Sequence, residues 1–136
     1  MNVRLQYDVD FQAGIYFNNT LQLNSYSVSM SLVTGTTDPM KINIAMERLK
    51  AFVHVELEHV VFINRVHENE AEMFQALGVN ICTLPEEPID QIIGLMLYCK
   101  LNAIMEGQLE ITALDIKSEL GSDVWYQHDE EESIGP

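Results

Sequence analysis

Hydrophobic and polar residues alternate near the start of the chain and predict two long strands. Residues 3–9 place an apolar side chain at every second position, and residues 26–32 repeat this pattern with serines in between. A period of two is typical of strands with one buried face. The Asn18-Asn19 pair favours a turn between the two runs, so we expect an antiparallel hairpin. Its serine-lined face should meet water, and residues 26–32 should form an exposed edge at which subunits could extend the sheet.

A helical repeat follows the predicted hairpin. Asp38 can cap a helix, and Pro39 suits the first helical position because its missing N–H would have no partner there. Apolar residues then recur at helical spacing, which predicts a first long helix over about residues 39–56. These residues are Ile42, Ala45, Met46, Leu49, Phe52, Val53 and Leu57.

Short apolar runs and helical segments alternate in the middle of the chain. Residues 60–63 and 79–84 predict two short strands, and residues 70–77, stopped by Gly78, predict a short helix between them. Residues 88–106 predict a second long helix that is apolar on nearly every side. We expect this helix to be covered by protein all round and to be the element around which the domain is built.

Two more strands complete the expected order. Residues 109–116 change the phase of their alternation near Ala113, which predicts a bulge, and residues 124–126 form a last short strand. The sequence therefore predicts an α+β fold with a single domain and a mixed sheet, in which antiparallel hairpins flank a β-α-β-α-β middle, with two long helices and one short helix. We place this domain at residues 1–128 and expect residues 129–136 to be an acidic, flexible tail.

The charge of the chain narrows the range of partners. Its 136 residues include 7 Lys and Arg against 21 Asp and Glu, a formal net charge of −14. Nucleic acids and anionic membranes are bound through Lys and Arg, so neither is an expected partner. Basic protein surfaces, cations or neutral surfaces remain, although the charge could also serve only to keep the protein soluble. Without a secretion signal or an apolar run near the ~20 residues of a membrane span, the expected location is the cytoplasm.

The cysteines and glycines do not form a recognisable catalytic or cofactor motif. Cys82 and Cys99 stand in apolar surroundings that favour buried thiols over a disulfide or metal ligands. The sequence has no Gly-rich phosphate loop, nucleophile elbow or zinc-ligand spacing. No cofactor is therefore predicted, and enzymatic activity stays open.

Polar residues after the two middle strands form a candidate ligand site. Arg65 and His67 follow the first of these strands, and Thr83, Glu86 and Glu87 end the second. If the strands are parallel neighbours, their carboxyl ends meet at one rim, where ligands bind in open α/β sheets. This rim could bind a small polar ligand or a divalent cation. Alternatively, its members are helix caps and solvated loop residues.

The densest group of possible metal ligands surrounds residues 54–59. His54 and Glu58 lie four apart and would share one face of a helix. The two histidines of this segment are five apart, whereas the zinc-protease signature needs them four apart. His54 and Glu58 are therefore the candidate metal pair, and the alternative is the solvated side of an amphipathic helix.

The end of the chain is a candidate interaction surface. Two aromatic residues stand beside an acidic run there, and together they could contact a partner protein. The residues are Trp125, Tyr126, Asp129, Glu130, Glu131 and Glu132. The alternative is that the aromatic pair closes the edge of the core.

Two stretches of the chain, residues 46–65 and 84–106, resemble the small accessory proteins encoded by tailed bacteriophages. The resemblance implies a non-enzymatic binder of phage or host proteins, located in the host cytoplasm. Together with the charge, it favours an acidic protein-interaction domain that docks on basic protein surfaces. One alternative is a ligand- or cation-binding protein or enzyme that uses the Arg65, His67 and Glu86 rim. Another is a structural or assembly subunit that forms a homo-oligomer.

Overall fold

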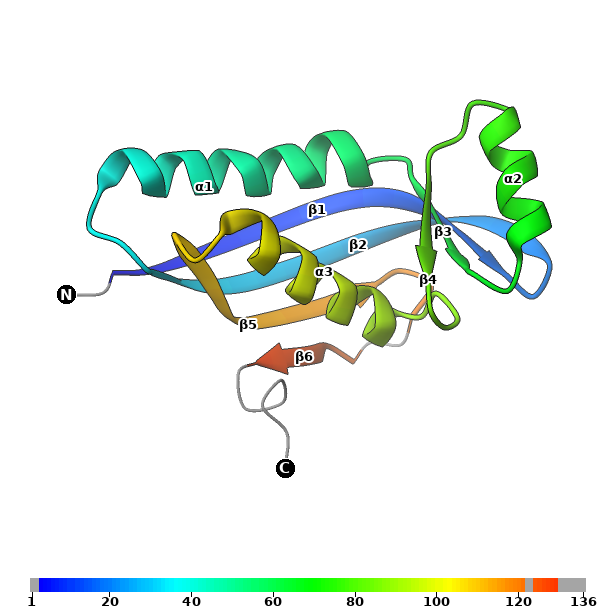
Figure 1. The fold of residues 1–136 in the computed structure, drawn as a ribbon. Helices are drawn as coiled ribbons and strands as arrows, with labels where there is room; N and C mark the ends of the chain where they lie inside the picture. Colours follow the sequence, from blue (N-terminus) through cyan, green and yellow to red (C-terminus); the bar gives the residue numbers. More distant parts are fainter. Residues whose placement is uncertain (1–2, 122–123, 130–136) are drawn as a thin grey trace.

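The computed structural model describes residues 3–121 and 124–129 as one α+β domain built on a six-stranded mixed sheet (Figure 1). The strands lie in the order β4-β3-β1-β2-β5-β6. The elements are β1 (Arg4–Phe17), β2 (Thr20–Thr34), α1 (Pro39–Ala51), the π-helix η1 (Phe52–Leu57), β3 (Val61–Asn64), α2 (Glu68–Ala76), β4 (Ile81–Leu84), α3 (Asp90–Met105), β5 (Leu109–Ser118) and β6 (Tyr126–Asp129). The predicted fold class is confirmed, and the first long helix continues as a π-helix.

The predicted hairpin is β1 and β2, joined by a tight turn. Asn18 and Asn19 both have positive φ, 53° and 58°, as the favoured two-residue hairpin turn requires, and asparagine tolerates this conformation. β2 pairs with β1 on one side and with β5 on the other. The prediction that residues 26–32 form an exposed edge is therefore wrong. The edges of the described sheet are β4 and β6.

The remaining pairings follow the expected pattern. β1, β3 and β4 are parallel neighbours, whereas β5 and β6 add antiparallel to the other side of the hairpin. The register between β2 and β5 shifts beside Ser31 and Leu32, so the bulge predicted near Ala113 is present. The last strand begins at Tyr126, later than predicted, and includes Asp129, which was expected to start the tail.

The helices cover the two faces of the sheet unequally. α1, η1 and α3 pack on one face and share a core with the inward residues of β1, β2 and β5. α2 lies apart from α1 and α3, at the end of the sheet formed by β3 and β4 (Figure 1). It packs there in a second, smaller cluster with Tyr16, Val61 and Ile63. Alternation along β3 explains this division, since Phe62 belongs to the large core and its neighbours to the small one.

The middle of the β1–β2 hairpin is polar on the second face. β1 and β2 align Asp8 with Ser29 across the hairpin, and the Ser29 hydroxyl donates to Asp8 Oδ1 at 2.8 Å. Gln6 Nε2 donates to the same two residues. Hydrogen bonds to Gln6 and Ser29 hold the pKa of Asp8 below its ordinary value. The serine-lined face is therefore a polar surface, as the sequence predicted.

α3 is not enclosed on every side, which corrects the prediction for this helix. Leu97 and Leu101 are 1% exposed, whereas Leu95 is 47% exposed. Cys99 is also exposed and Cys82 is only half-buried, so the expectation of two buried thiols is wrong, although burial raises the pKa of Cys82. The apolar pattern of α3 therefore does not mean that protein covers this helix on every side.

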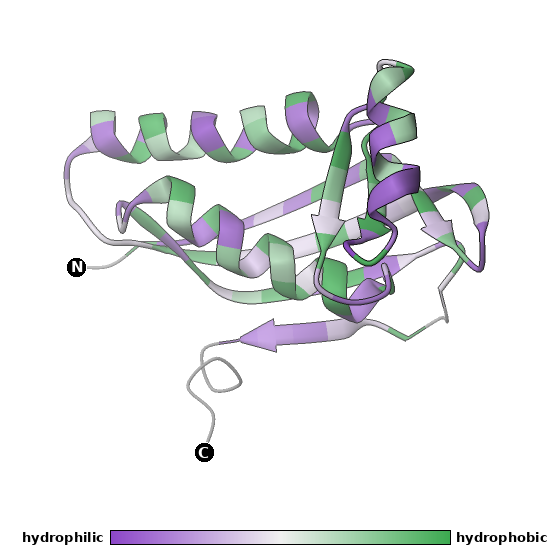
Figure 2. Ribbon diagram, turned by 45° about the vertical axis from the view of Figure 1, so that its right-hand side comes forward, coloured by the Kyte–Doolittle hydropathy of each residue, from purple (hydrophilic) through white to green (hydrophobic). Residues whose placement is uncertain are grey.

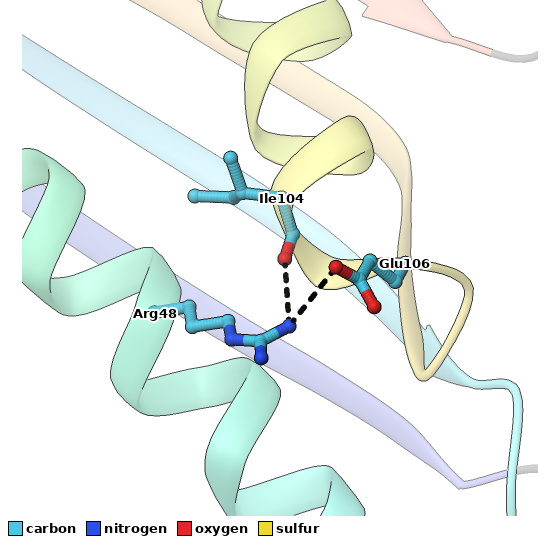
Figure 3. A network of polar contacts seen from close by, with 3 residues as sticks. All are labelled: Arg48, Ile104 and Glu106. Atoms are coloured by element: carbon cyan, nitrogen blue, oxygen red, sulfur yellow. Dashed lines mark hydrogen bonds and ion pairs between the residues drawn. The ribbon is translucent and has the colours of Figure 1, made fainter.

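Arg48 connects α1 to the end of α3. Its Nη1 lies 3.5 Å from the carbonyl oxygen of Ile104 and 3.4 Å from Glu106 Oε1 (Figure 3). The side chains of Arg48 and Glu106 are 49% and 69% exposed, so water competes with this ion pair.

Hydrophilic and hydrophobic bands alternate along α1, as expected for a helix that packs on a core with one face (Figure 2).

Candidate functional site

A cavity of about 480 Å³ lies where α3 begins, β5 ends and the β1–β2 turn closes. Its polar lining comes from Asn18, Gln22, Asn24, Asp90 and Ser118. Its apolar lining comes from Ile15, Phe17, Pro88, Ile89, Leu120 and Tyr126. A few polar groups on a mainly apolar wall are typical of sites that bind small organic molecules.

Asp90 is the most unusual group in this cavity. It is the first residue of α3 and only 6% exposed. Oδ1 accepts a hydrogen bond of 2.6 Å from the Ser118 hydroxyl, whereas Oδ2 is buried and has no hydrogen-bond partner among the described residues. The positive end of the helix dipole favours a carboxylate here. Leaving a buried carboxylate oxygen without a donor is costly, so the position is suited to a donor supplied by a ligand.

The chain segment after β5 folds over Asp90. The amide of Gly121 donates to Ser118 Oγ at 3.1 Å. A Cβ at position 121 would overlap Asp90 Oδ2, so only glycine allows the backbone to approach this closely. Residues 119–121 therefore form a turn that rests directly on the carboxylate.

Asn24 fixes the same turn from the side of β2. It is 3% exposed, and its Oδ1 accepts hydrogen bonds from the amides of Ser25 and Leu120, each at 3.0 Å. The amide of Glu119 donates to the carbonyl oxygen of Ser25. The wall of the cavity is thus tied to the hairpin by backbone and side-chain bonds, which gives it a defined shape without a ligand.

Tyr26 is a neutral phenol next to this region. It is 1% exposed and stacks on Phe11 with ring centroids 5.0 Å apart. Burial raises the pKa of Tyr26, and the negative charge of Asp90 acts in the same direction, whereas the neighbouring Asn24 side chain acts against it. The net rise keeps the phenol protonated at physiological pH, so Asp90 remains the acidic group of the cavity.

The predicted rim lies on the carboxyl ends of β3 and β4, which are parallel neighbours as expected. Arg65, Thr83 and Glu86 are exposed, and His67 contacts the Tyr16 ring edge-on, with centroids 5.3 Å apart. Glu87 Oε1 accepts a hydrogen bond of 2.9 Å from the buried Asn64 side chain. None of these residues lines the cavity at Asp90. Glu87 therefore makes a structural hydrogen bond with Asn64, and ligand binding at the rim stays a prediction.

The predicted metal pair is split between two environments. His54 is exposed on η1, whereas Glu58 Oε1 accepts a hydrogen bond of 3.2 Å from the Gln12 amide. Within residues 3–121 and 124–129, no three His, Cys, Asp or Glu side chains are grouped as metal ligands. Metal binding by His54 and Glu58 therefore stays a prediction.

The predicted interaction surface is only partly described. Trp125 is 43% exposed, with Lys117 Nζ 4.8 Å from its ring centroid. Tyr126 lines the cavity at Asp90, and both aromatic residues also line a second cavity of about 420 Å³ against Leu95 and Tyr98 of α3. Asp129 ends β6, and Glu130, Glu131 and Glu132 lie outside the described residues. A partner for this surface stays a prediction.

Among the described residues, no helix combines the length and hydrophobicity needed to cross a membrane.

No protein-family model matches this chain, and no curated protein sequence matches it either. Several solved structures share its fold. The uncharacterized protein WS1659 of Wolinella succinogenes is 13% identical with a TM-score of 0.64, and the match covers 96% of this chain and 99% of that one. The 6-pyruvoyltetrahydropterin synthase of Plasmodium vivax is 12% identical with a TM-score of 0.58, over 94% and 97% of the two chains. The Plasmodium falciparum synthase is 12% identical with a TM-score of 0.54, over 93% and 96%.

These matches define the class of fold. The chain has the T-fold seen in 6-pyruvoyltetrahydropterin synthases. The resemblance to accessory proteins of bacteriophages is therefore wrong, because the structures that share this fold over nearly the whole chain include pterin synthases. The main functional hypothesis, a non-enzymatic acidic domain that docks on basic proteins, is corrected for the same reason. A ligand-binding protein or enzyme, one of the alternatives, fits the fold better.

Proposed function

We propose that this protein binds a small planar heterocycle of the pterin class in the cavity at the start of α3, with Asp90 as its anchor. The observation that carries this proposal is the buried Asp90 carboxylate, whose Oδ2 has no partner among the described residues. Proteins of known activity that share the fold include 6-pyruvoyltetrahydropterin synthases, which supports the choice of ligand class.

The hydrogen-bonding chemistry of the Asp90 carboxylate determines which edge of the ligand can face it. An ionised carboxylate only accepts hydrogen bonds, and bonds from N–H groups to an ion are shorter and stronger than neutral ones. A pterin presents an amino group and a ring N–H side by side on its pyrimidine edge. One of these donors satisfies Oδ2, and the other faces the neighbouring amide oxygens of the cavity.

The size and lining of the cavity suit such a ring. About 480 Å³ is within the usual range for small-molecule sites, which is roughly 300–1,000 Å³. Ile15, Phe17 and Ile89 offer apolar surface for the faces of a flat ring, and Gln22 adds a polar group. The Gly121 backbone covers Oδ2, so a ligand donor reaches this oxygen only if Gly121 moves and gives up its hydrogen bond to Ser118.

Calorimetric titration with two related pteridines tests the proposal. Pterin has the 2-amino donor, and lumazine has an oxo group in its place. We expect pterin to bind at least about 10-fold more tightly than lumazine. Both edge donors of pterin meet an acceptor, whereas lumazine keeps only its ring N–H and sets an oxo group against the second acceptor, and an unsatisfied buried acceptor costs about 1–3 kcal/mol. Asp90→Asn should abolish this preference, because its amide nitrogen presents donors where the carboxylate accepted.

Asp10→Asn is the matched control, because Asp10 is an exposed carboxylate on β1, away from the cavity. It should bind both ligands like the unmodified protein. Equal affinity for pterin and lumazine, or equal effects of Asp90→Asn and Asp10→Asn, would contradict the proposed role of Asp90.

Assembly into a homo-oligomer was one of the expectations from the sequence, and we keep it as part of this proposal. Other proteins with this fold are comparable in length, since the matches cover 96–99% of their chains. Sedimentation of the purified chain tests it, and a single species of one-chain mass at all concentrations would contradict it.

A further inference from the structure

Ser118 connects the Asp90 carboxylate to the turn that covers it. Its Oγ lies 2.6 Å from Asp90 Oδ1 and 3.1 Å from the Gly121 amide nitrogen. A serine hydroxyl has one proton to donate and two lone pairs to accept with. The amide of Gly121 can only donate, so it occupies a lone pair and leaves the hydroxyl proton for Asp90.

We propose that Ser118 is a positioning residue, which holds Asp90 as an ionised acceptor with Oδ1 engaged and leaves Oδ2, beneath Gly121, as the oxygen that a ligand donor can satisfy. This inference rests on the proposed function of Asp90 as the ligand anchor. It adds the group that sets the charge and orientation of that anchor. A carboxylate without such a donor would be held less firmly in one orientation and would be protonated more readily in a buried place.

The opposite arrangement of protons explains the site less well. A protonated Asp90 could donate to Ser118 Oγ, which would then accept from Asp90 and Gly121 at once. Asp90 is the first residue of α3, however, and the positive end of a helix dipole stabilises the ionised form. The neutral Tyr26 brings no negative charge against it. Both facts favour the ionised carboxylate with Ser118 as donor.

The consequence concerns which ligands the site accepts. An anchor that is held ionised accepts hydrogen bonds at Oδ2 and cannot donate one. Heterocycles with N–H groups on the binding edge are therefore favoured, and those with only oxo acceptors there are rejected. Ser118 contributes to this selection, although the proposal gives it no contact with the ligand.

The first experiment compares Ser118→Ala with Ser118→Thr, which keeps the hydroxyl. Pterin affinity is measured by calorimetry between about pH 4 and 7, where carboxylates titrate. In Ser118→Ala we expect affinity near neutral pH to fall about 10-fold, and its loss on acidification to begin at a higher pH, because a hydrogen bond to the ionised carboxylate is lost. Ser118→Thr should restore both. An unchanged pH profile in Ser118→Ala, or a failure of threonine to rescue, would overturn the inference.

Other titratable groups could also contribute to the pH dependence of binding. Tyr26 on β2 interacts electrostatically with Asp90, Tyr126 on β6 lines the same cavity, and Glu87 and Glu119 stand close to Asp90 and Ser118 in the sequence. The tyrosines do not titrate in this range. Because the exchange of serine for alanine leaves the other groups in place, the difference between the two profiles reports on Asp90.

A second measurement needs no ligand. The ¹³C resonance of the Asp90 carboxyl, assigned by its loss in Asp90→Asn, is followed as the free protein is acidified. We expect the ionised form to persist to lower pH in the unmodified protein than in Ser118→Ala. If pterin does not bind but this difference appears, the ligand class is wrong and the role of Ser118 stands. If pterin binds but the difference is absent, the role of Ser118 is wrong and the proposed function stands.

Discussion

The Ser118 hydroxyl lies 2.6 Å from Asp90 Oδ1, although 28 positions of the chain separate the two residues. Asp90 begins α3 and Ser118 ends β5. Because α3 packs against β5 and the chain turns back between them at Gly107, the start of the helix and the end of the strand meet at one end of the domain. This closure brings together a helix dipole, a buried carboxylate and a hydroxyl at the wall of a cavity.

Asp90→Asn should change the free energy of unfolding by no more than about 1 kcal/mol. The amide nitrogen that replaces Oδ2 is also unpaired, but a neutral group costs less to bury than a charged one, so the exchange brings a modest gain. The loss of negative charge at a helix start, about 0.3–1 kcal/mol, and the weaker bond to Ser118 oppose this gain. Urea unfolding measures the difference. A loss above about 3 kcal/mol would indicate that Oδ2 is paired in the folded protein.

Gly94→Ala should destabilise the fold by about 1–3 kcal/mol, although alanine is the better helix former. A Cβ at this position would lie 2.6 Å from Ile116 Cγ2 and 3.0 Å from the His128 ring, so α3, β5 and β6 would have to separate. Thermal and urea unfolding measure the loss. Alanine favours a helix over glycine by about 1 kcal/mol. A gain in stability of this size would show that β6 moves away from the added methyl group at little cost.

The sequence predicted the fold and only part of the candidate site. Periodicity predicted the hairpin, the parallel pair β3 and β4 and the bulge in β5, because each depends on local alternation and turn residues. In the sequence, Asp90 is only one negative charge near the start of the helix predicted over residues 88–106. Its role in the candidate site depends on the hydrogen bond from Ser118, which is 28 positions away, and no local sequence pattern predicts that contact.

The misplaced edge strand has a similar cause. Serines alternate with apolar residues along β2 because one face of the sheet is polar, and this pattern says nothing about how many neighbours a strand has. The pairing of β5 with β2 joins segments far apart in the sequence, and the alternation of residues along β2 does not determine it. The same applies to α3, where Leu95 and Cys99 follow the helical repeat but stay exposed.

Tyr26→Phe should make the protein less sensitive to alkali. Burial raises the pKa of Tyr26 in the folded state above its ordinary value of 10.0, so above about pH 10 the unfolded chain loses a proton that the folded chain keeps. The stability contributed by this group is present below pH 10 and is lost as the pH rises further. Phenylalanine keeps the contacts with Phe11 and Phe62 and has no proton to lose.

The measurement for Tyr26 is urea unfolding at increasing pH from about 9 to 12. Tyr7→Phe is the comparison, because burial raises the pKa of Tyr7 as well, although that side chain is more exposed. We expect the stability of the unmodified protein to fall more steeply than that of Tyr26→Phe. Parallel curves would mean that the Tyr26 hydroxyl ionises in the folded state as readily as in the unfolded chain.

Glu106→Gly should be neutral or should stabilise the protein by up to about 1 kcal/mol. Glu106 has a positive φ of 52° at the end of α3, a conformation that glycine adopts without strain. Its ion pair with Arg48 is exposed and contributes at most about 1 kcal/mol, often nothing measurable. Arg48→Ala is the control that removes the pair and keeps the backbone strain. A loss above about 1 kcal/mol in both variants would show that this ion pair outweighs the strain.

Glu87→Ala distinguishes bracing from ligand binding at the rim of β3 and β4. The Asn64 side chain is 8% exposed and donates to Glu87 Oε1 at 2.9 Å, so alanine leaves a buried amide donor unpaired and should cost about 1–3 kcal/mol of stability. Arg65→Ala, at an exposed neighbour, should cost less than about 0.5 kcal/mol. Both variants should keep the pterin affinity of the unmodified protein, measured by calorimetry on folded samples. If Arg65→Ala abolishes binding while Asp90→Asn does not, the rim is the ligand site and the cavity at Asp90 is not.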